Sequence, residues 1–336
     1  MNDKVVGKLK NSKIVWYAVS SLILLSLAYV ADFGDFISAL KSINRFYMLL
    51  SLISGLSVFL VWGYVWHSFF EELNMQISLF KSYKIFMAGT LMNSITPLGQ
   101  AGGEPFMAFV ISDNAETSYE KALSSVVSAD LVNAIPFIAY LIVAVIYLLA
   151  AGSINNIVWQ AVYLLTGIGV ILAASGYIIL YKRGSAAAKI YGALDYLETK
   201  SIVERRHIEA VKRKMEEIHS NFSRIGENPK HLVRVTAISH LAPLTQYVSM
   251  YFILLGLGIQ PGVTGVFLTI ILGGLAMWSP TPGGSGTVEA AMSGLLVALY
   301  PGIGLDTALA AAVLFRFTTY WPGILIGYIS LIDLKR

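Results

Sequence analysis

Residues 94–104 read SITPLGQAGGE and residues 279–289 read SPTPGGSGTVE, and these two matching stretches each interrupt a long apolar segment. Five of the eleven positions are identical, with Ser, Thr, Pro, Gly and Glu at the same offsets. Proline removes a backbone donor and glycine weakens a helix, so neither segment is expected to continue as one helix. The match predicts an internal repeat whose two copies each carry a broken helix.

The sequence around these breaks is typical of a membrane protein. Of the 336 residues, 56% are hydrophobic and only 13% are charged, whereas a soluble domain is about 25% charged. The uncharged runs are long enough, or nearly so, for the roughly 17–25 residues of a spanning helix, and they lack the alternation of barrel strands. They cover residues 14–31, 46–70, 134–151, 157–181 and 317–332. The predicted fold class is all-α, a polytopic membrane helix bundle.

Clusters of Lys and Arg orient the chain, because they favour the cytoplasmic side of a membrane. Four lysines precede the first apolar run, and residues 182–230 hold eleven Lys and Arg. With these regions inside, the chain makes six full crossings and two re-entrant hairpins that enter from opposite sides. The predicted crossings are about 14–31, 46–70, 122–150, 157–181, 232–256 and 307–332, and the hairpins are 83–111, from the cytoplasm, and 263–300, from outside.

This pattern divides the chain into two halves joined by a connector. The first half covers residues 1–181, the cytoplasmic connector 182–231, and the second half 232–336. We expect the protein in the cytoplasmic membrane with both termini in the cytoplasm. Apolar residues in the connector recur at steps of three and four, which predicts an amphipathic helix. It could pack against the bundle, lie on anionic headgroups or dock a glycosyltransferase.

Four ionisable residues fall inside apolar segments, namely Glu104, Asp130, Glu289 and Arg316. Each costs a few kcal/mol or more in a bilayer, which makes it a candidate functional residue. Glu104 and Glu289 are predicted to start the second arm of each hairpin, where a carboxylate also caps a helix. Arg316, expected near the start of the last span, could pair with either glutamate or bind a phosphate. Asp130 could pair with a base from a loop or line a cavity.

The residues of the two breaks complete the predicted substrate site. Freed amides at the start of a half-helix can hold an anionic headgroup. The alternative is that the breaks are kinks that only aid helix packing. Besides the four ionisable residues, the candidates are Gln100, Gly102, Gly103, Gly283, Gly284 and Ser285.

Other classes of function lack support in the sequence. The chain has no cysteine and therefore no thiolate metal site. It also has no phosphate-binding loop, no Gly-x-Ser-x-Gly nucleophile and no His-Glu-x-x-His motif. We expect no catalytic residue, metal or cofactor, and no enzymatic activity. The net charge of +4 fits cytoplasmic anchoring rather than nucleic-acid binding.

Three stretches resemble the lysylphosphatidylglycerol synthase transmembrane-region family, which includes flippase-like UPF0104-type membrane proteins. They are GGEP at 102–105, PTPGGSGTVEA at 280–290 and RFTTYW at 316–321. The resemblance covers nearly the whole chain, and it implies that the chain handles lipids. In bifunctional relatives this region flips a lysylated phospholipid made by a separate soluble domain, which we expect to be absent here. Archaeal relatives are implicated in handling dolichol-phosphate sugars.

The leading functional hypothesis is a flippase or scramblase for a phospholipid or a polyprenyl-phosphate-linked sugar. Membrane lipids are then the partners, with a lipid-modifying enzyme or glycosyltransferase as a further one. The headgroup would pass through a polar cavity between the hairpins while its chains stay in lipid. An ion-coupled carrier of a small solute is the first alternative, and an intramembrane lipid-modifying enzyme or a structural partner of a glycosyltransferase are the others.

Overall fold

The computed structural model describes residues 33–95, 100–150 and 205–334, and within these ranges every regular element is helical. Four stretches are long and apolar enough to cross a membrane, and all four match predicted crossings. The protein is therefore an all-α, multi-pass membrane helix bundle. The crossings are α3 (Arg45–Glu72), α6 (Tyr119–Ala150), α10 with α11 (Pro229–Ser239 and Leu241–Gly256) and α14 with α15 (Leu305–Thr319 and Trp321–Leu334).

Several predicted features lie outside the described residues. They are the crossings at 14–31 and 157–181, the start of the connector and the tip of the first hairpin at 96–99. One short element was not predicted. The segment after the first crossing, expected as a loop, contains helix α2 (Phe33–Ser42).

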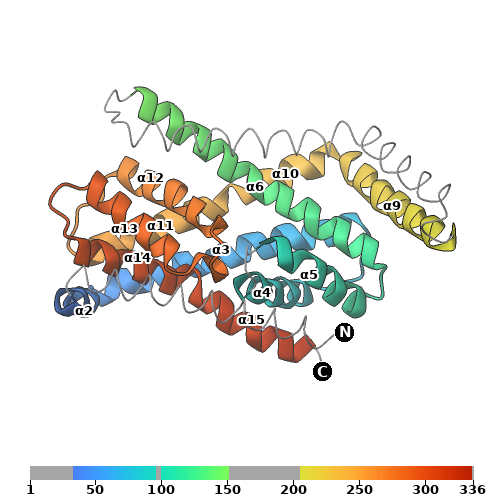
Figure 1. The fold of residues 1–336 in the computed structure, drawn as a ribbon, viewed down its shortest axis with the longest axis horizontal. Coiled ribbons are helices and arrows are strands. Elements are labelled where there is room, and N and C mark those ends of the chain that lie inside the picture. Colours follow the sequence, from blue (N-terminus) through green and yellow to red (C-terminus); the bar gives the residue numbers. More distant parts are fainter. Residues whose placement is uncertain (1–32, 96–99, 151–204, 335–336) are drawn as a thin grey trace.

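Each predicted hairpin is present as two packed helices. The first consists of α4 (Leu79–Ile95) and α5 (Gln100–Ala115), and the second of α12 (Val263–Gly274) and α13 (Thr287–Leu299). Two short 3-10 helices, η1 (Leu275–Trp278) and η2 (Pro282–Gly284), form the tip of the second hairpin. Figure 1 shows α4 and α5 toward one end of the bundle and α12 and α13 toward the other. The hairpins thus approach the middle from opposite ends, as the internal repeat predicts.

The first break is shorter than the sequence suggests. Helix α5 begins at Gln100, so Gly102 and Gly103 are helical and Glu104 lies beyond the first turn rather than at its start. Pro105 lies inside α5, where its ring removes the hydrogen bond that an N–H at this position would make to the carbonyl four residues earlier. Glycine is needed at Gly103, since an added Cβ would lie 1.5 Å from Asn93 Oδ1.

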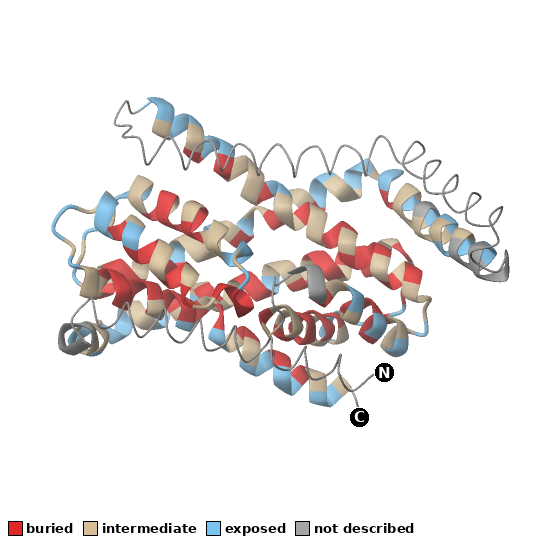
Figure 2. Cartoon of the chain, viewed as in Figure 1, coloured by how far each residue is buried: buried red, intermediate tan, exposed pale blue. Residues whose placement is uncertain are grey.

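Buried side chains fill the spaces between helices, whereas large apolar side chains on the outer faces are exposed (Figure 2). One buried cluster lies among α3, α4, α5 and α6, and the second among α11, α12, α13 and α14. The exposed outer side chains suit contact with lipid, for example Leu49 and Ile53 on α3 and Leu325 and Ile329 on α15.

A chain of buried hydroxyl groups ties three helices together at the centre of the bundle. Ser51 Oγ of α3 lies 2.9 Å from Ser249 Oγ of α11, which lies 2.9 Å from Thr318 Oγ1 of α14. Gly55 lets α3 approach α14, because an added Cβ would lie 2.7 Å from the Thr318 carbonyl oxygen. Small residues and hydrogen bonds between helices are the usual means of packing helices in lipid. They hold Arg316, two residues before Thr318, in a fixed place.

The predicted amphipathic helix of the connector is α9 (Arg205–Gly226). It docks on the start of α6, where Lys214 Nζ lies 2.7 Å from Glu120 Oε1 and Ser118 Oγ donates to the carboxylate of Glu217. The hydrogen bond to Glu120 raises the pKa of Lys214 above its ordinary value. The described part of the connector is therefore attached to the bundle, as the packing alternative expected.

Candidate functional site

Arg316 lies at a break in the last crossing. Helix α14 ends at Thr319, Tyr320 has φ −122° and ψ −57°, and α15 begins at Trp321. The break follows from Pro322, which has no N–H to donate to the Thr318 carbonyl. Arg316 is thus in the last turn of α14. The sequence had suggested a place near the start of the crossing, and that prediction was wrong. This break faces the tip of the second hairpin.

The partner of Arg316 is Glu289, one of the two glutamates that the sequence left open. Arg316 Nε donates to Glu289 Oε1 at 3.3 Å, and Nη2 donates to the Gly283 carbonyl at 2.6 Å. Both charged side chains are 4% exposed. The ring of Tyr320 covers the guanidinium, with Cζ 3.5 Å from the ring centroid. The cation is enclosed by a carboxylate, a carbonyl and an aromatic face.

Glu289 has two roles at once. It is the third residue of α13, and its Oε2 accepts a hydrogen bond from the Gly286 amide at 2.8 Å, which caps the helix. Its Oε1 is left for Arg316. The capping expected from the sequence is therefore confirmed for Glu289, and the same carboxylate links the start of α13 to the end of α14.

The tip of the second hairpin depends on glycine. Gly283, Gly284 and Gly286 have φ values of 56°, 68° and 82°, which L side chains rarely adopt. At Gly283 an added Cβ would also lie 2.1 Å from Tyr320 Oη. This backbone turns the Gly283 carbonyl toward Arg316 and the Gly286 amide toward Glu289. The amide of Ser285 donates to the Pro282 carbonyl at 3.1 Å and so helps to close the turn.

The predicted candidates of the first half form a separate group. Glu104 of α5 and Asp130 of α6 interact electrostatically with each other, and no hydrogen bond or ion pair joins either to Arg316 in the described chain. Gln100 and Gly102 lie in the first turn of α5. Asn93 Oδ1, which approaches Gly103, is buried without a hydrogen-bond partner among the described residues. Of the two glutamates, the structure thus pairs Glu289 with Arg316 and sets Glu104 beside Asp130.

Tyr320 links the second cluster to the first hairpin. Its hydroxyl donates to the carbonyl of Ser94, near the end of α4, at 3.5 Å. The end of α4 thus meets the tip of the second hairpin beside the guanidinium of Arg316. Sequence reasoning missed Tyr320, although its position four residues after Arg316 and just before Trp321-Pro322 places it on the same face at a predicted helix break.

Comparison with known proteins shows what the chain is similar to. The sequence profile of the family described as lysylphosphatidylglycerol synthase TM region matches residues 14–327. A UPF0104 membrane protein of Pyrococcus horikoshii is 25% identical over 300 residues, 87% of this chain and 88% of that protein. Another, from Methanothermobacter thermautotrophicus, is 20% identical over 322 residues, 93% of each chain. A third, from Methanocaldococcus jannaschii, is 24% identical over 332 residues, 95% of this chain and 94% of the relative.

Proposed function

Because the chain belongs to the lysylphosphatidylglycerol synthase TM region family, we propose that it translocates a phospholipid or a polyprenyl-phosphate-linked sugar across the membrane. The observation that carries this proposal is the buried Arg316–Glu289 pair at the point where the end of α4 meets the tip of the second hairpin. A charge inside a membrane is costly, and its usual role is contact with a substrate or ion. The pair lies on irregular backbone, which supports a binding site of the kind built by broken helices.

The guanidinium of Arg316 has N–H donors that could bind a ligand. It has five N–H donors, and two of them have acceptors among the described residues. The other donors could bind a phosphate oxygen, for which the planar fork is well suited. Arg316 is only 3% exposed, so a headgroup would reach it after α4 moves away from the second hairpin. Separation would break the contact of Tyr320 with Ser94 and uncover the guanidinium.

The proposed step exchanges one anion for another. A headgroup phosphate would replace part of the contact that Glu289 makes with Arg316, while Glu289 still caps α13 through Oε2. The apolar chains of the lipid would stay in the bilayer. No nucleotide-binding motif is present in the sequence, so transport would be passive or would use an ion gradient. On this proposal the protein is a carrier and not an enzyme.

We place the end of the bundle that holds α9 in the cytoplasm. The starts of α4, α6 and α10 lie at this end and carry Lys81, Lys84, Lys121 and Lys230, whereas the loops 257–262 and 300–304, which follow α11 and α13 at the other end, carry no charge. The cytoplasmic membrane is the compartment that this proposal requires.

The absence of cysteine from the chain allows a direct check of orientation. Gln76 and Gln260 are exposed in loops at opposite ends of the bundle, so Gln76→Cys and Gln260→Cys form a matched pair. An impermeant maleimide applied to intact cells should label the variant at position 260 and spare the one at position 76 until the cells are opened. The reverse pattern of labelling would overturn the assignment.

The function is tested by translocation of fluorescent lipids in proteoliposomes. The panel holds an anionic phospholipid, a cationic aminoacylated phospholipid and a polyprenyl-phosphate sugar. We expect fast translocation of one class, reduced at least about tenfold by Arg316→Lys, since lysine keeps the charge but loses the planar fork. Thermal unfolding of the variant in detergent shows whether its fold is intact.

Arg224→Lys is the matched control, because Arg224 is exposed in the last turn of α9 and away from the hairpins. It should leave translocation unchanged. Background rates for the whole panel, with folded protein, would contradict the proposal and favour the carrier of a soluble solute. Equal losses of translocation rate from Arg316→Lys and Arg224→Lys would show that the site around Arg316 has no specific role in translocation.

A further inference from the structure

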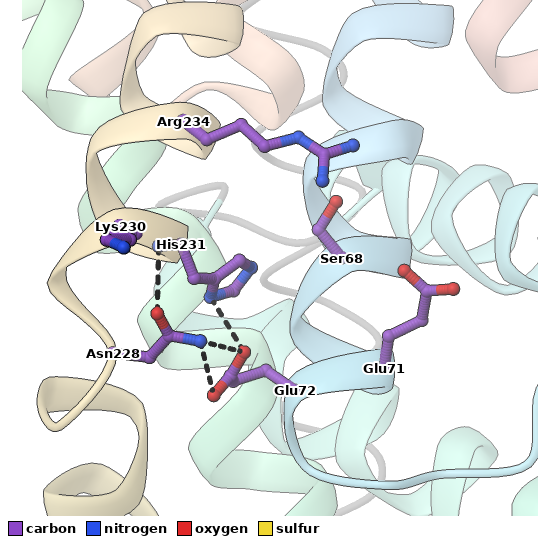
Figure 3. A pocket seen from close by; sticks show the side chains of 7 residues that line it. All are labelled: Ser68, Glu71, Glu72, Asn228, Lys230, His231 and Arg234. Atoms are coloured by element: carbon purple, nitrogen blue, oxygen red, sulfur yellow. Dashed lines mark hydrogen bonds and ion pairs between the residues drawn. The ribbon is translucent and has the colours of Figure 1, made fainter.

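A polar cavity lies at the end of the bundle that we place in the cytoplasm, between the first half of the chain and the segment that leads from the connector into the second half. It has a volume of about 360 Å³ and opens between the end of α3 and the start of α10 (Figure 3). Its lining residues are Ser68, Glu71, Glu72, Asn228, Lys230, His231 and Arg234. None of them was singled out by the sequence, and none belongs to the site around Arg316. One wall comes from the first half of the chain, and the other comes from the last residues of the connector together with Arg234 of the second half.

His231 is a buried polar side chain without a hydrogen bond. Its side chain is 10% exposed, and its ring packs edge-on against Phe69 with the centroids 5.2 Å apart. Neither ring nitrogen has a hydrogen-bond partner in the described chain, and Nδ1 lies 3.4 Å from Glu72 Oε2. Nε2 faces the space between α3 and α10 in Figure 3. Burying a polar atom unpaired is costly, which indicates that a ligand in the cavity completes its bonding.

The side chains on the wall formed by α10 are suited to bind an anion. Lys230 and Arg234 are exposed cations in the first turns of this helix, and they line the same cavity as His231. Arg234 Nη2 donates to the hydroxyl of Tyr64, which positions the guanidinium toward α3. The start of a helix adds a partial positive charge at this place.

The two carboxylates on the wall formed by α3 already have partners within the protein. Glu72 accepts hydrogen bonds from Asn228 Nδ2 at 3.1 and 3.3 Å and lies beside His231. Glu71 is 67% exposed, and its Oε1 lies 3.5 Å from His67 Nε2. Both carboxylates thus have partners outside the cavity or at its base. The groups left for a ligand are cations and the buried imidazole.

We propose that this cavity binds a phosphate group, contributed by the headgroup of a lipid in the cytoplasmic leaflet. The identity of the ligand as a lipid rests on the proposed function, whereas the phosphate chemistry rests on His231, Lys230 and Arg234. Because the walls come from the end of α3 and the start of α10, an occupied cavity holds these two helices together. A headgroup bound in this cavity would thus be held at the cytoplasmic end before α4 moves away from the second hairpin.

Binding is measured by calorimetry on the full chain purified in detergent, without any transport step. The probes are dihexanoyl phosphatidylglycerol, inorganic phosphate and dihexanoylglycerol, which has the same chains and no phosphate. We expect phosphatidylglycerol to bind and dihexanoylglycerol not to bind. Arg234→Gln and His231→Gln should each raise the dissociation constant about tenfold or more, as loss of a charge-assisted or buried hydrogen bond does.

Arg224→Gln removes one exposed cation from the same end of the protein and should leave the dissociation constant unchanged. Binding of inorganic phosphate as well would show that the phosphate alone suffices, and its failure to bind would assign the site to the lipid. The inference is wrong if no phosphate probe binds, or if Arg224→Gln weakens binding as much as Arg234→Gln. A wild-type protein that binds the phosphate probe but translocates no lipid of the panel would count against the proposed function and leave this site standing.

Discussion

Replacing Arg316 with glutamine is expected to destabilise the protein by about 3–5 kcal/mol, because the change leaves a buried carboxylate without its counter-charge. Glu289 is 4% exposed and would keep only the Gly286 amide as a partner for Oε2. The free energy of unfolding in detergent measures this loss. Adding Glu289→Gln should recover most of it, since two neutral amides can hydrogen-bond without a buried charge.

Lys84→Gln is the comparison for this result. Lys84 also forms an ion pair, with Asp333, but these side chains are 27% and 48% exposed. Exposed pairs contribute about 0–1 kcal/mol, so the change should cost little. An Arg316→Gln protein no less stable than Lys84→Gln, or a double variant no better than the single one, would show that the buried pair does not hold the hairpin tip.

The second large effect is expected at Gly327, where α15 crosses α4. An added Cβ at Gly327 would lie 2.4 Å from the Met87 carbonyl oxygen and 2.9 Å from Leu91 Cβ. One turn earlier, a Cβ at Gly323 would lie 2.8 Å from Phe59 Cζ. The two glycines form a small-xxx-small pattern that lets helices approach closely in lipid.

We therefore expect Gly327→Leu to cost about 3 kcal/mol or more, at the upper end of overpacking, because backbone atoms of α4 cannot move aside as a flexible side chain can. Thermal unfolding and protease sensitivity would report separation of α15 from α4. Gly294→Leu in α13 is the matched control, since nothing lies within 4 Å of its added Cβ. It should be neutral or slightly stabilising, as glycine is a weak helix former. Equal effects of both changes would refute the close crossing.

Sequence patterns predicted the framework of the bundle well. The four predicted crossings that fall on described residues, and the hairpin arms, agree with the helices within a few residues at most ends, because charge-free runs and Gly-Pro clusters mark helices and breaks directly. Errors arose where a local signal was ambiguous. Gly102 and Gly103 indicated irregular backbone, but the structure uses Gly103 for close approach to Asn93 inside a helix.

The candidate site was only partly predictable. Glu289 and Arg316 could be recognised as charges inside apolar segments, but 27 positions separate them and the sequence does not reveal which glutamate meets the arginine. The Gly283 carbonyl, which accepts from Arg316 at 2.6 Å, has no signature because every residue has a carbonyl. The cavity around His231 was missed because its walls are far apart in the chain and meet only after α10 packs against α3.

The crossing of α15 over α4 has a consequence for the order in which the protein is made. The face of α4 that carries Met87 and Leu91 is synthesised early, and its cover, α15, is complete 239 residues after Ile95. At about 5–20 residues per second, that interval is about 12–48 s on the ribosome. During this time the first hairpin is in the membrane, and the face of α4 that later contacts Gly327 is not yet covered by α15. Synthesis of the last helix is thus the event that completes the first hairpin, and a ribosome stalled before it would leave this face open to quality-control proteases.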